Sequence, residues 1–384
     1  MAIGILLFLM EIKLLRTFYL GIYKNRVYNR RGLMNKVRIL NKEVIREILD
    51  MKTVIDKVEE AYLMKEKFLG EVFPMITHEF EPGVADMDIK SGHIEGVDIF
   101  GLKLVSWFSK NKEKELPDLI GTVMVFDSNT GMPKGILNGE YITSMRTGAA
   151  GAIGAKYLAR KNSKTLLMVG TGQQAPYQIA ATLMVMPSIE KVLVYNPRSI
   201  DRAKSFREGI SDHLIEKFLK PYEKDQNLYE TYKEKFNVDF EVVESIEEAT
   251  RKADIIITAT PSNKPIIMKD WVEPGTHLSC IGADLSGKQE VDEEILADCI
   301  LFTDDIKQSM NIGEAEMAVK RKLLYKEDYM GEIGAVILDF AKGREQESDI
   351  TVFDSTGIAL QDLITANYAL EIAKERDLGD LVNL

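Results

Sequence analysis

A glycine-containing stretch at residues 164–183 has the spacing of a nucleotide-binding turn. An apolar run over 166–169 is followed by two glycines that are separated by one residue. A helical pattern then begins, with Ala175 at the third small position. Gly170 permits a tight turn, and Gly172 leaves room for a pyrophosphate, which the free N–H groups of the helix N-terminus would bind. The predicted cofactor-binding residues here are Gly170, Thr171, Gly172, Gln173, Gln174 and Ala175. The alternative is an ordinary turn between a strand and a helix.

The second strand of such a unit usually ends in the residues that distinguish NAD from NADP. In this chain it ends "VLVYNPRS", with Asn196, Arg198 and Ser199 where an NAD-preferring site usually has a carboxylate. No carboxylate would repel a 2′-phosphate, and Arg198 could pair with one. This pattern favours NADP(H), unless Arg198 is only a solvated surface residue.

Polar residues also follow later apolar runs, at the positions where open α/β sheets place their sites. The predicted cofactor residues after these runs are Thr258, Ala259 and Thr260 in "TATPSNKP" and Gly357 in "FDSTGIALQD". Asp284 comes directly after the apolar run that ends near 283. A carboxylate there is either a helix cap or an acid of the site.

The elements around these residues predict an α/β protein. Apolar runs alternate with helical patterns, which predicts a Rossmann-type doubly wound parallel sheet with strands at 165–169, 191–195, 240–243, 254–260, 277–283 and 299–303. Before it, two helices within 41–67, strands within 98–109 and 119–137 and a glycine- and alanine-rich helix at 139–160 predict an α+β domain. We expect a substrate-binding and dimerisation domain at 34–150 plus 335–384, and a nucleotide-binding domain at 151–334 with a helical insertion near 205–237.

Composition excludes several classes of protein. The net charge of −11 argues against nucleic acid as the main partner, and the 45% hydrophobic content suffices for a core. The two cysteines, Cys280 and Cys299, lie in apolar runs and are expected to be reduced core residues of a cytoplasmic protein. No CxxC or HExxH pattern occurs, so no metal site is expected.

The first 33 residues are expected to be a poorly ordered extension. Their apolar run ends after ten residues, which is too short to span a bilayer, and the basic residues follow it rather than precede it. We predict that translation starts at Met34 and that no membrane is involved. A peripheral membrane-binding helix is the alternative.

Five segments together resemble the ornithine cyclodeaminase/μ-crystallin family. They are "GLKLVSWF", "GTVMVFDSNTGMPKGILNGEYITSMRTGAA", "VGTGQQA", "EPGTHLSCIGADLSGKQEVD" and "VFDSTGIALQD", in the family's order between about 100 and 365. The resemblance implies an NAD(P)-binding domain, a second domain that binds substrate and forms a homodimer, and hydride transfer at the α-carbon of an amino acid or its imine.

The resemblance also assigns roles to single residues. Lys103 matches the catalytic lysine that contacts the substrate carboxylate and helps polarise the imine, and Arg146 matches the arginine that clamps the carboxylate. Thr122 matches a threonine near the cofactor, and Asp284 matches the catalytic acid beside the substrate amine. The ketimine reductase branch lacks that acid. One arginine of the cyclodeaminases is missing upstream, where His78 or Lys90 is predicted to bind substrate instead.

The leading functional hypothesis is an ornithine cyclodeaminase-like enzyme that converts L-ornithine to L-proline and ammonia. One alternative is an NAD(P)-dependent amino-acid dehydrogenase or imine reductase. The other is a binding protein that takes NADPH and a small molecule without turnover.

Overall fold

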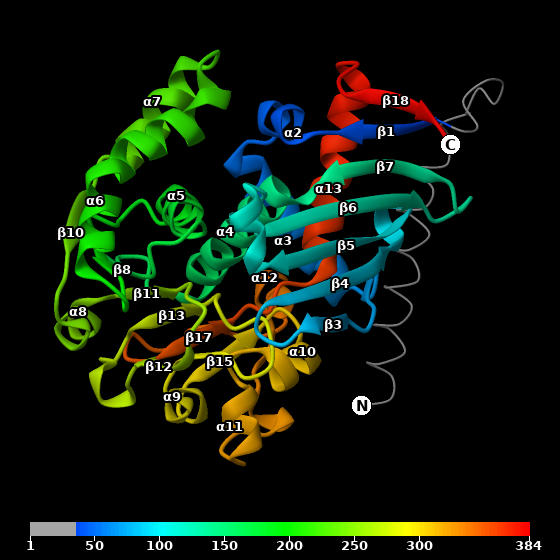
Figure 1. The fold of residues 1–384 in the computed structure, drawn as a ribbon. Coiled ribbons are helices and arrows are strands. Elements are labelled where there is room, and N and C mark those ends of the chain that lie inside the picture. Colours follow the sequence, from blue (N-terminus) through cyan, green and yellow to red (C-terminus); the bar gives the residue numbers. More distant parts are fainter. Residues whose placement is uncertain (1–35) are drawn as a thin grey trace.

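The computed structural model describes residues 36–384. The predicted N-terminal extension and the proposed start at Met34 lie outside the described residues. Two large sheets lie side by side with helices between and around them (Figure 1). The fold is therefore mixed α/β, as the sequence predicts.

The first sheet is mainly antiparallel and has the order β18-β1-β7-β6-β5-β4-β2, with β3 paired to β4. Its strands are β1 Lys36–Leu40, β2 Gly70–Val72, β3 Ile76–Glu81, β4 Ala85–Ile94, β5 Ile99–Phe108, β6 Leu119–Asp127, β7 Pro133–Asn138 and β18 Asp380–Asn383. The helices packed with it are α2 Lys42–Ile48, α3 Met51–Glu66 and α13 Ala359–Glu375. The predicted helices within 41–67 and strands within 98–109 and 119–137 are confirmed.

The second sheet is parallel throughout and has the order β10-β9-β8-β11-β13-β17-β15-β16. Its strands are β8 Thr165–Val169, β9 Lys191–Tyr195, β10 Asp239–Val242, β11 Ile255–Thr258, β13 His277–Cys280, β15 Ile300–Thr303, β16 Gly331–Glu332 and β17 Thr351–Asp354. All six predicted strands occur. The direction of winding reverses between β8 and β11, which is where such sheets place a ligand.

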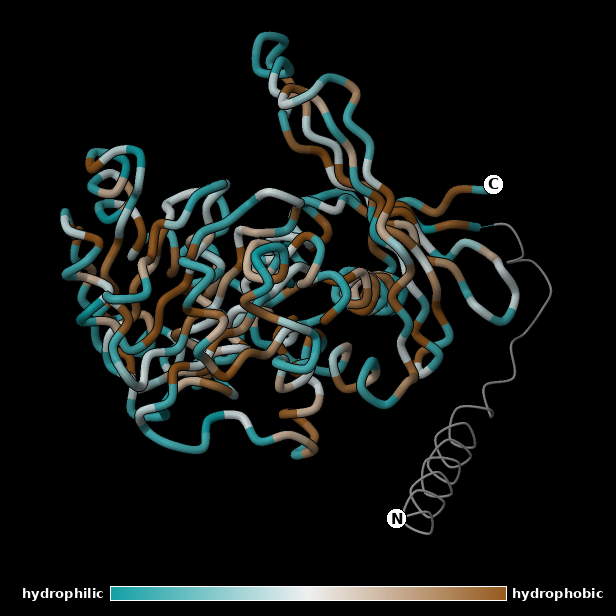
Figure 2. Tube along the Cα trace, turned by 90° about the horizontal axis from the view of Figure 1, so that it is seen from below, coloured by the Kyte–Doolittle hydropathy of each residue, from teal (hydrophilic) through white to brown (hydrophobic). Residues whose placement is uncertain are grey.

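The remaining elements connect these strands. They are α5 Ala175–Val185, α8 Ile246–Lys252, β12 Asn263–Ile267, β14 Gln289–Val291, α9 Glu293–Ala297, α10 Ile306–Ile312, α11 Glu316–Lys320 and α12 Ile333–Ile337. Strands β12 and β14 pair with each other in a small separate sheet. Hydrophobic stretches follow the strands and the inner helices, and hydrophilic turns lie mostly outside (Figure 2).

One predicted boundary is wrong. The sequence pattern places the chain after 335 in the first domain, yet β17 lies in the middle of the parallel sheet, between β13 and β15. The run "TVFD" is fully buried, and a short apolar run does not reveal which sheet it joins. Only α13 and β18 return to the first sheet.

Helix α4, Gly139–Leu158, crosses the other predicted boundary and packs against both parts of the molecule. Its small residues allow close contact, as predicted. A Cβ on Gly148 would lie 2.7 Å from the Tyr177 carbonyl oxygen on α5, and one on Gly154 would lie 2.5 Å from the Phe353 ring on β17.

The insertion near 205–237 is helical, as predicted. It consists of α6 Ile200–Leu214, a π-helical turn at Ile215–Leu219, a 3₁₀ turn at Lys220–Tyr222 and α7 Gln226–Phe236. It packs on α5 and also reaches the first domain, because the Tyr222 hydroxyl donates to Asp50 Oδ1 at 2.7 Å. The insertion therefore ties the nucleotide-binding part to the start of α3.

Within residues 36–384, no helix has the length and apolar character needed to cross a membrane. The same residues contain no cluster of histidine, cysteine and acidic side chains that could hold a metal ion. Cys280 is buried and Cys299 is half-buried, and neither forms a disulfide.

Candidate active site

Two cations and one carboxylate form a buried cluster between the sheets. Lys103 projects from β5, Arg146 from α4 and Asp362 from α13, and all three side chains are buried. Lys103 Nζ lies 3.0 and 2.9 Å from the two Asp362 oxygens, and Arg146 Nε donates to Asp362 Oδ1 at 3.0 Å. The structure thus brings together the two residues predicted to bind a substrate carboxylate, with an internal carboxylate as their partner.

The charges in this cluster oppose one another. Burial, then the positive charge of Arg146, lower the pKa of Lys103 to about 7, although Asp362 counteracts them. Burial would raise the pKa of Asp362, but Arg146 and Lys103 outweigh burial and hold it below its usual value. Near neutral pH, Lys103 can therefore either hold or release a proton.

Lys90 joins the cluster through the backbone after β17. Its Nζ donates to the carbonyl oxygens of Thr356 and Gly357 at 2.9 and 3.0 Å. Gly357 has φ +77°, and a Cβ there would lie 2.6 Å from Arg146 Nη1. Gly357, predicted as a cofactor residue, thus lies against the guanidinium of Arg146.

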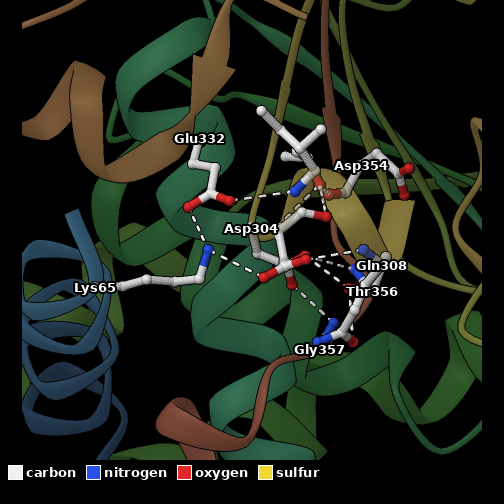
Figure 3. A network of polar contacts seen from close by, with 10 residues as sticks. Lys65, Asp304, Gln308, Glu332, Asp354, Thr356 and Gly357 are labelled. Carbon is white, nitrogen blue, oxygen red and sulfur yellow. Dashed lines mark hydrogen bonds and ion pairs between the residues drawn. The ribbon is translucent and has the colours of Figure 1, made fainter. Parts of the chain in front are cut away.

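Asp304 shapes this turn. It is buried at the end of β15, and its carboxylate accepts from Thr356 N, Thr356 Oγ1 and Gly357 N at 3.1, 2.8 and 2.7 Å (Figure 3). Beside it, Lys65 on α3 pairs with Asp305 at 3.1 Å and with Glu332, which joins the two parts of the molecule. The turn that holds Lys90 is therefore anchored to a neighbouring strand.

Asp284 follows β13 and does not cap a helix, because the next helix is α9, whose N-cap is Asp292. Its side chain is 47% exposed and accepts from Lys288 Nζ at 2.5 Å. Burial alone would raise the pKa of Asp284. The positive charges of Lys288, Lys90 and Arg146 together outweigh burial, so the pKa lies below its usual value. Asp284 is therefore an accessible, ionised carboxylate within the electrostatic reach of the cationic cluster.

The glycine turn has the geometry that a pyrophosphate requires. Gly170 has φ +107°, and a Cβ there would lie 2.6 Å from the Ala259 carbonyl oxygen. No heavy atom lies within 4 Å of a Cβ built on Gly172. Gln174 precedes α5 without a side-chain cap, and Pro176 in the first turn has no N–H. The N–H groups of Ala175 and Tyr177 donate to the carbonyl oxygens of Gly172 and Gln174 at 3.1 and 3.0 Å, so a pyrophosphate here would be bound mainly by the backbone of the turn itself. These residues fit a dinucleotide.

Several of the remaining predicted cofactor residues contact this turn, and the others lie elsewhere. Asn196 Nδ2 donates to Thr171 Oγ1 at 2.6 Å, and Asn196 Oδ1 accepts from the backbone N–H groups of Arg198 and Ser199. Ser199 caps α6, and Arg198 is exposed. Gln173 donates to Glu140 at 3.3 Å. Thr258 is the last residue of β11, and Ala259 and Thr260 follow it. Thr122 lies on β6 beside the start of α4.

A cleft of about 700 Å³ opens between the two parts of the molecule, and its lining includes neither the buried cationic cluster nor Asp284 itself. One wall comes from the β3–β4 hairpin and the other from the loop after Asp284 and from α10. Lining residues that matter here are His78, Glu79, Asp86 and Asp88 on the first wall and Gln308 and Asn311 on the second. His78 is exposed on this wall and does not join the buried cluster that contains Lys90.

Sequence reasoning missed Asp362 and Asp304. Both are buried acids that hold the predicted residues in place. A signal for Asp362 was present, since it is a carboxylate within the apolar helical run "GIALQDLITA". Such a residue needs a buried cation as its partner.

Comparison with known proteins gives relatives over nearly the whole chain. Alanine dehydrogenase of Archaeoglobus fulgidus is 36% identical over 344 residues, covering 90% of this chain and 97% of the relative. A solved archaeal alanine dehydrogenase dimer with bound NAD has a TM-score of 0.80 at 34% identity, covering 91% of this chain and 99% of that one.

Two further solved structures share the fold. Δ(1)-pyrroline-2-carboxylate reductase of Thermococcus litoralis, in complex with NADH and L-proline, has a TM-score of 0.79 at 30% identity and covers 90% of this chain and all of that one. A lysine cyclodeaminase has a TM-score of 0.73 at 26% identity and covers 91% and 96%.

The family model described as ornithine cyclodeaminase/mu-crystallin matches residues 35–216 and 217–377. The glycine turn and Asp284 thus lie at the carboxyl ends of strands in a Rossmann-type sheet, a fold shared with NAD-binding relatives, and this chain belongs to the ornithine cyclodeaminase/mu-crystallin family.

Proposed function

We propose that this protein catalyses NAD(P)-dependent hydride transfer at the α-carbon of an amino acid, as an amino-acid dehydrogenase or imine reductase. The observation that carries the proposal is the buried Lys103–Asp362–Arg146 cluster, with the accessible Asp284 close to it. Relatives of 30% identity or more include an alanine dehydrogenase and a pyrroline-2-carboxylate reductase, which supports net redox chemistry.

The residues present suit this reaction. Arg146 and Lys103 offer charged donors to a substrate carboxylate, and a guanidinium can bind it through two hydrogen bonds. The substrate ammonium must lose a proton before the α-hydrogen leaves as hydride, and the accessible carboxylate of Asp284 is our candidate acceptor. When bound, the nicotinamide ring supplies the hydride acceptor, and the amino acid becomes an imino acid.

A substrate panel tests the proposal. Each amino acid is incubated with stoichiometric NAD+ or NADP+, and the reduced cofactor is measured by absorbance. We expect at least one amino acid to reduce the cofactor, and Arg146→Lys, which keeps the charge but loses the planar fork, to raise KM for that amino acid. Cofactor binding without turnover of any amino acid or imine would support the non-catalytic alternative.

Cyclodeamination of a basic amino acid is the second candidate, and the acidic wall of the cleft favours it. Asp88 lies two residues from Lys90 on the same face of β4, roughly 7 Å along the strand. Asp86 and its cross-strand partner Glu79 continue this wall. Carboxylates at that distance from the cationic cluster suit a substrate with a terminal amine. Release of ammonia and proline from ornithine with catalytic cofactor, without net reduction, would establish it.

We also propose a preference for NADP(H). Arg198 is exposed at the end of the second strand, and none of the ion pairs in residues 36–384 involves it. A 2′-phosphate could therefore take it as a partner. Solved relatives contain NAD or NADH, so the affinities of this protein for NADH and NADPH must be compared. Arg198→Ala should weaken NADPH binding and leave NADH binding unchanged; equal effects on both would contradict the preference.

We further propose a homodimer, as in the archaeal alanine dehydrogenase structure. Large apolar side chains are exposed at one end of the first sheet and the loop before β6, namely Ile76, Phe80, Leu116, Leu119 and Ile120. Exposed apolar surface of this kind is typical of an interface. Light scattering should give twice the 43.4 kDa chain mass.

A further inference from the structure

Two loops that carry candidate site residues meet on one buried side chain. Glu290 lies on β14 and has no exposed surface. Its Oε1 accepts from Thr260 N, after β11, at 2.6 Å, and its Oε2 accepts from Gly282 N, after β13, at 2.8 Å. Because β11 and β13 are neighbours in the parallel sheet, one carboxylate bridges the carboxyl ends of adjacent strands.

These loops are packed too closely to move independently. A Cβ on Gly282 would lie 2.3 Å from the Thr260 carbonyl oxygen and 2.5 Å from Glu290 Oε2. On the other side, a Cβ on Gly170 would lie 2.6 Å from the Ala259 carbonyl oxygen. The backbone that Glu290 holds therefore touches the glycine turn directly.

Glu290 is in turn held in place by its neighbours. Glu314 is fully buried, and its Oε1 accepts from the backbone N–H groups of Glu290 and Val291 at 2.7 and 2.6 Å. The backbone N–H of Glu314 donates to Asp354 Oδ1 on β17 at 3.1 Å. The strand that presents Glu290 is thus fixed to the parallel sheet, and its carboxylate has a defined position.

We propose that Glu290 is a positioning residue that sets the separation between the cofactor-side loop 259–262 and the loop 281–288, which carries Asp284. Neither donor can be satisfied elsewhere without moving its loop, since buried N–H groups need an acceptor. Glu290 therefore acts on cofactor binding through Ala259 and on proton transfer through Asp284. The second effect rests on the proposed function, whereas the first requires only that the cofactor binds.

Glu290→Gln tests this, because the amide retains one acceptor but turns an NH₂ group toward the other backbone N–H. The matched control is Glu293→Gln, a buried carboxylate three residues away that accepts from Gln289 Nε2 at 2.6 Å and pairs with Arg321. The dissociation constants of NADH and NADPH are measured by fluorescence, amide hydrogen exchange by mass spectrometry, and stability by thermal unfolding.

We expect Glu290→Gln to raise the cofactor dissociation constant about tenfold, the equivalent of one hydrogen bond, and to speed exchange in 259–262 and 281–284. Glu293→Gln should change neither. Equal loss of thermal stability in both variants, with unchanged cofactor affinity and loop exchange, would overturn the proposal. If Glu290→Gln does not fold, Glu290→Asp is used instead, because its shorter carboxylate can reach only one of the two donors. It should also weaken cofactor binding and speed exchange in the two loops, by smaller amounts.

A double variant separates positioning from the proposed chemistry. In an Asp284→Asn background, Glu290→Gln should lower kcat no further, while it still weakens cofactor binding. An additive loss of kcat would overturn the link to Asp284. A wild-type chain that binds cofactor but turns over no substrate would refute the proposed function alone. The measured effects of Glu290→Gln on cofactor affinity and amide exchange would still test the positioning role of Glu290.

Discussion

Replacing Asp362 by asparagine should shift the ionisation of Lys103 while leaving the shape of the site unchanged. The carboxylate lies 2.9 and 3.0 Å from Lys103 Nζ, without exposed surface, and it favours the charged amine. An opposite charge at such a distance typically changes a pKa by about one to three. The pKa of Lys103, about 7 in the wild type, should therefore fall by that amount in Asp362→Asn.

The assay is the pH dependence of kcat/KM in the oxidative direction, with an amino acid that reduces the cofactor. We expect the wild-type kcat/KM to fall as the pH rises through about 7, because a neutral Lys103 no longer offers a charged donor to the substrate carboxylate. In Asp362→Asn this limb should move to lower pH. Lys103→Arg should abolish it, because a guanidinium remains charged. Glu371→Gln, an exposed acid on the same helix, serves as the control and should leave the limb in place.

Stability gives an independent check. The folded pKa of Lys103 lies below its ordinary value of 10.5, so between about 7 and 10.5 the unfolded chain binds a proton that the folded chain does not. The Lys103 contribution to the free energy of unfolding therefore rises with pH across that window. A lower pKa of Lys103 in the Asp362→Asn variant should reduce the free energy of unfolding only below pH about 7. The reduction is about 1.4 kcal/mol for each tenfold decrease in the proton affinity of Lys103. A limb that stays near pH 7 in a folded variant, with a pH-independent loss of stability, would refute the reasoning.

Three further substitutions test other parts of the site. Asp284→Asn should lower kcat by ~10²–10⁴-fold with nearly unchanged cofactor affinity, and retained kcat would remove its catalytic role. Gly172→Ala should melt like the wild type, because its Cβ meets no protein atom, but it should bind cofactor weakly, because the Cβ fills the space proposed for the pyrophosphate. Gly170→Ala should instead lose thermal stability, because Gly170 has φ +107° and a Cβ there would lie 2.6 Å from a carbonyl oxygen. Tyr222→Phe removes the hydrogen bond to Asp50 and should lower the urea-unfolding free energy by about 1 kcal/mol without affecting kcat; an unchanged midpoint would mean that the insertion is not tied there.

Local sequence patterns predicted the elements better than their partners. The strand at 165–169, the glycine turn and the helix at 139–160 were each identifiable because hydropathy period and small residues act over a few neighbours. The placement of β17 was not, because its four buried residues fit either sheet. Its partners β13 and β15 lie about 50 to 70 residues earlier in the chain, and no local period encodes such a pairing.

The same limit applies to the site. The glycine turn is contiguous, so its residues were found together. Lys103 and Asp362 are 259 positions apart, and Asp304 acts through the backbone of Thr356 and Gly357. A carboxylate that serves a distant backbone N–H carries no sequence pattern of its own. Only its unusual place in an apolar run marks it, as for Asp362.

Exposure and partners decide which of these acids can do chemistry. Asp362 is buried and pairs with two cations, Lys103 and Arg146. Asp304 accepts from the turn at Gly357, and Glu290 accepts from the backbone of two loops. None of the three can approach a substrate without releasing a group that the site needs. Asp284 differs, because its side chain is 47% exposed and its ion-pair partner within residues 36–384, Lys288, comes from its own loop. A substrate ammonium can replace Lys288 as its partner, and we therefore propose Asp284 as the acceptor of the amine's proton. The buried acids instead hold the cations, the Gly357 turn and the two loops in position.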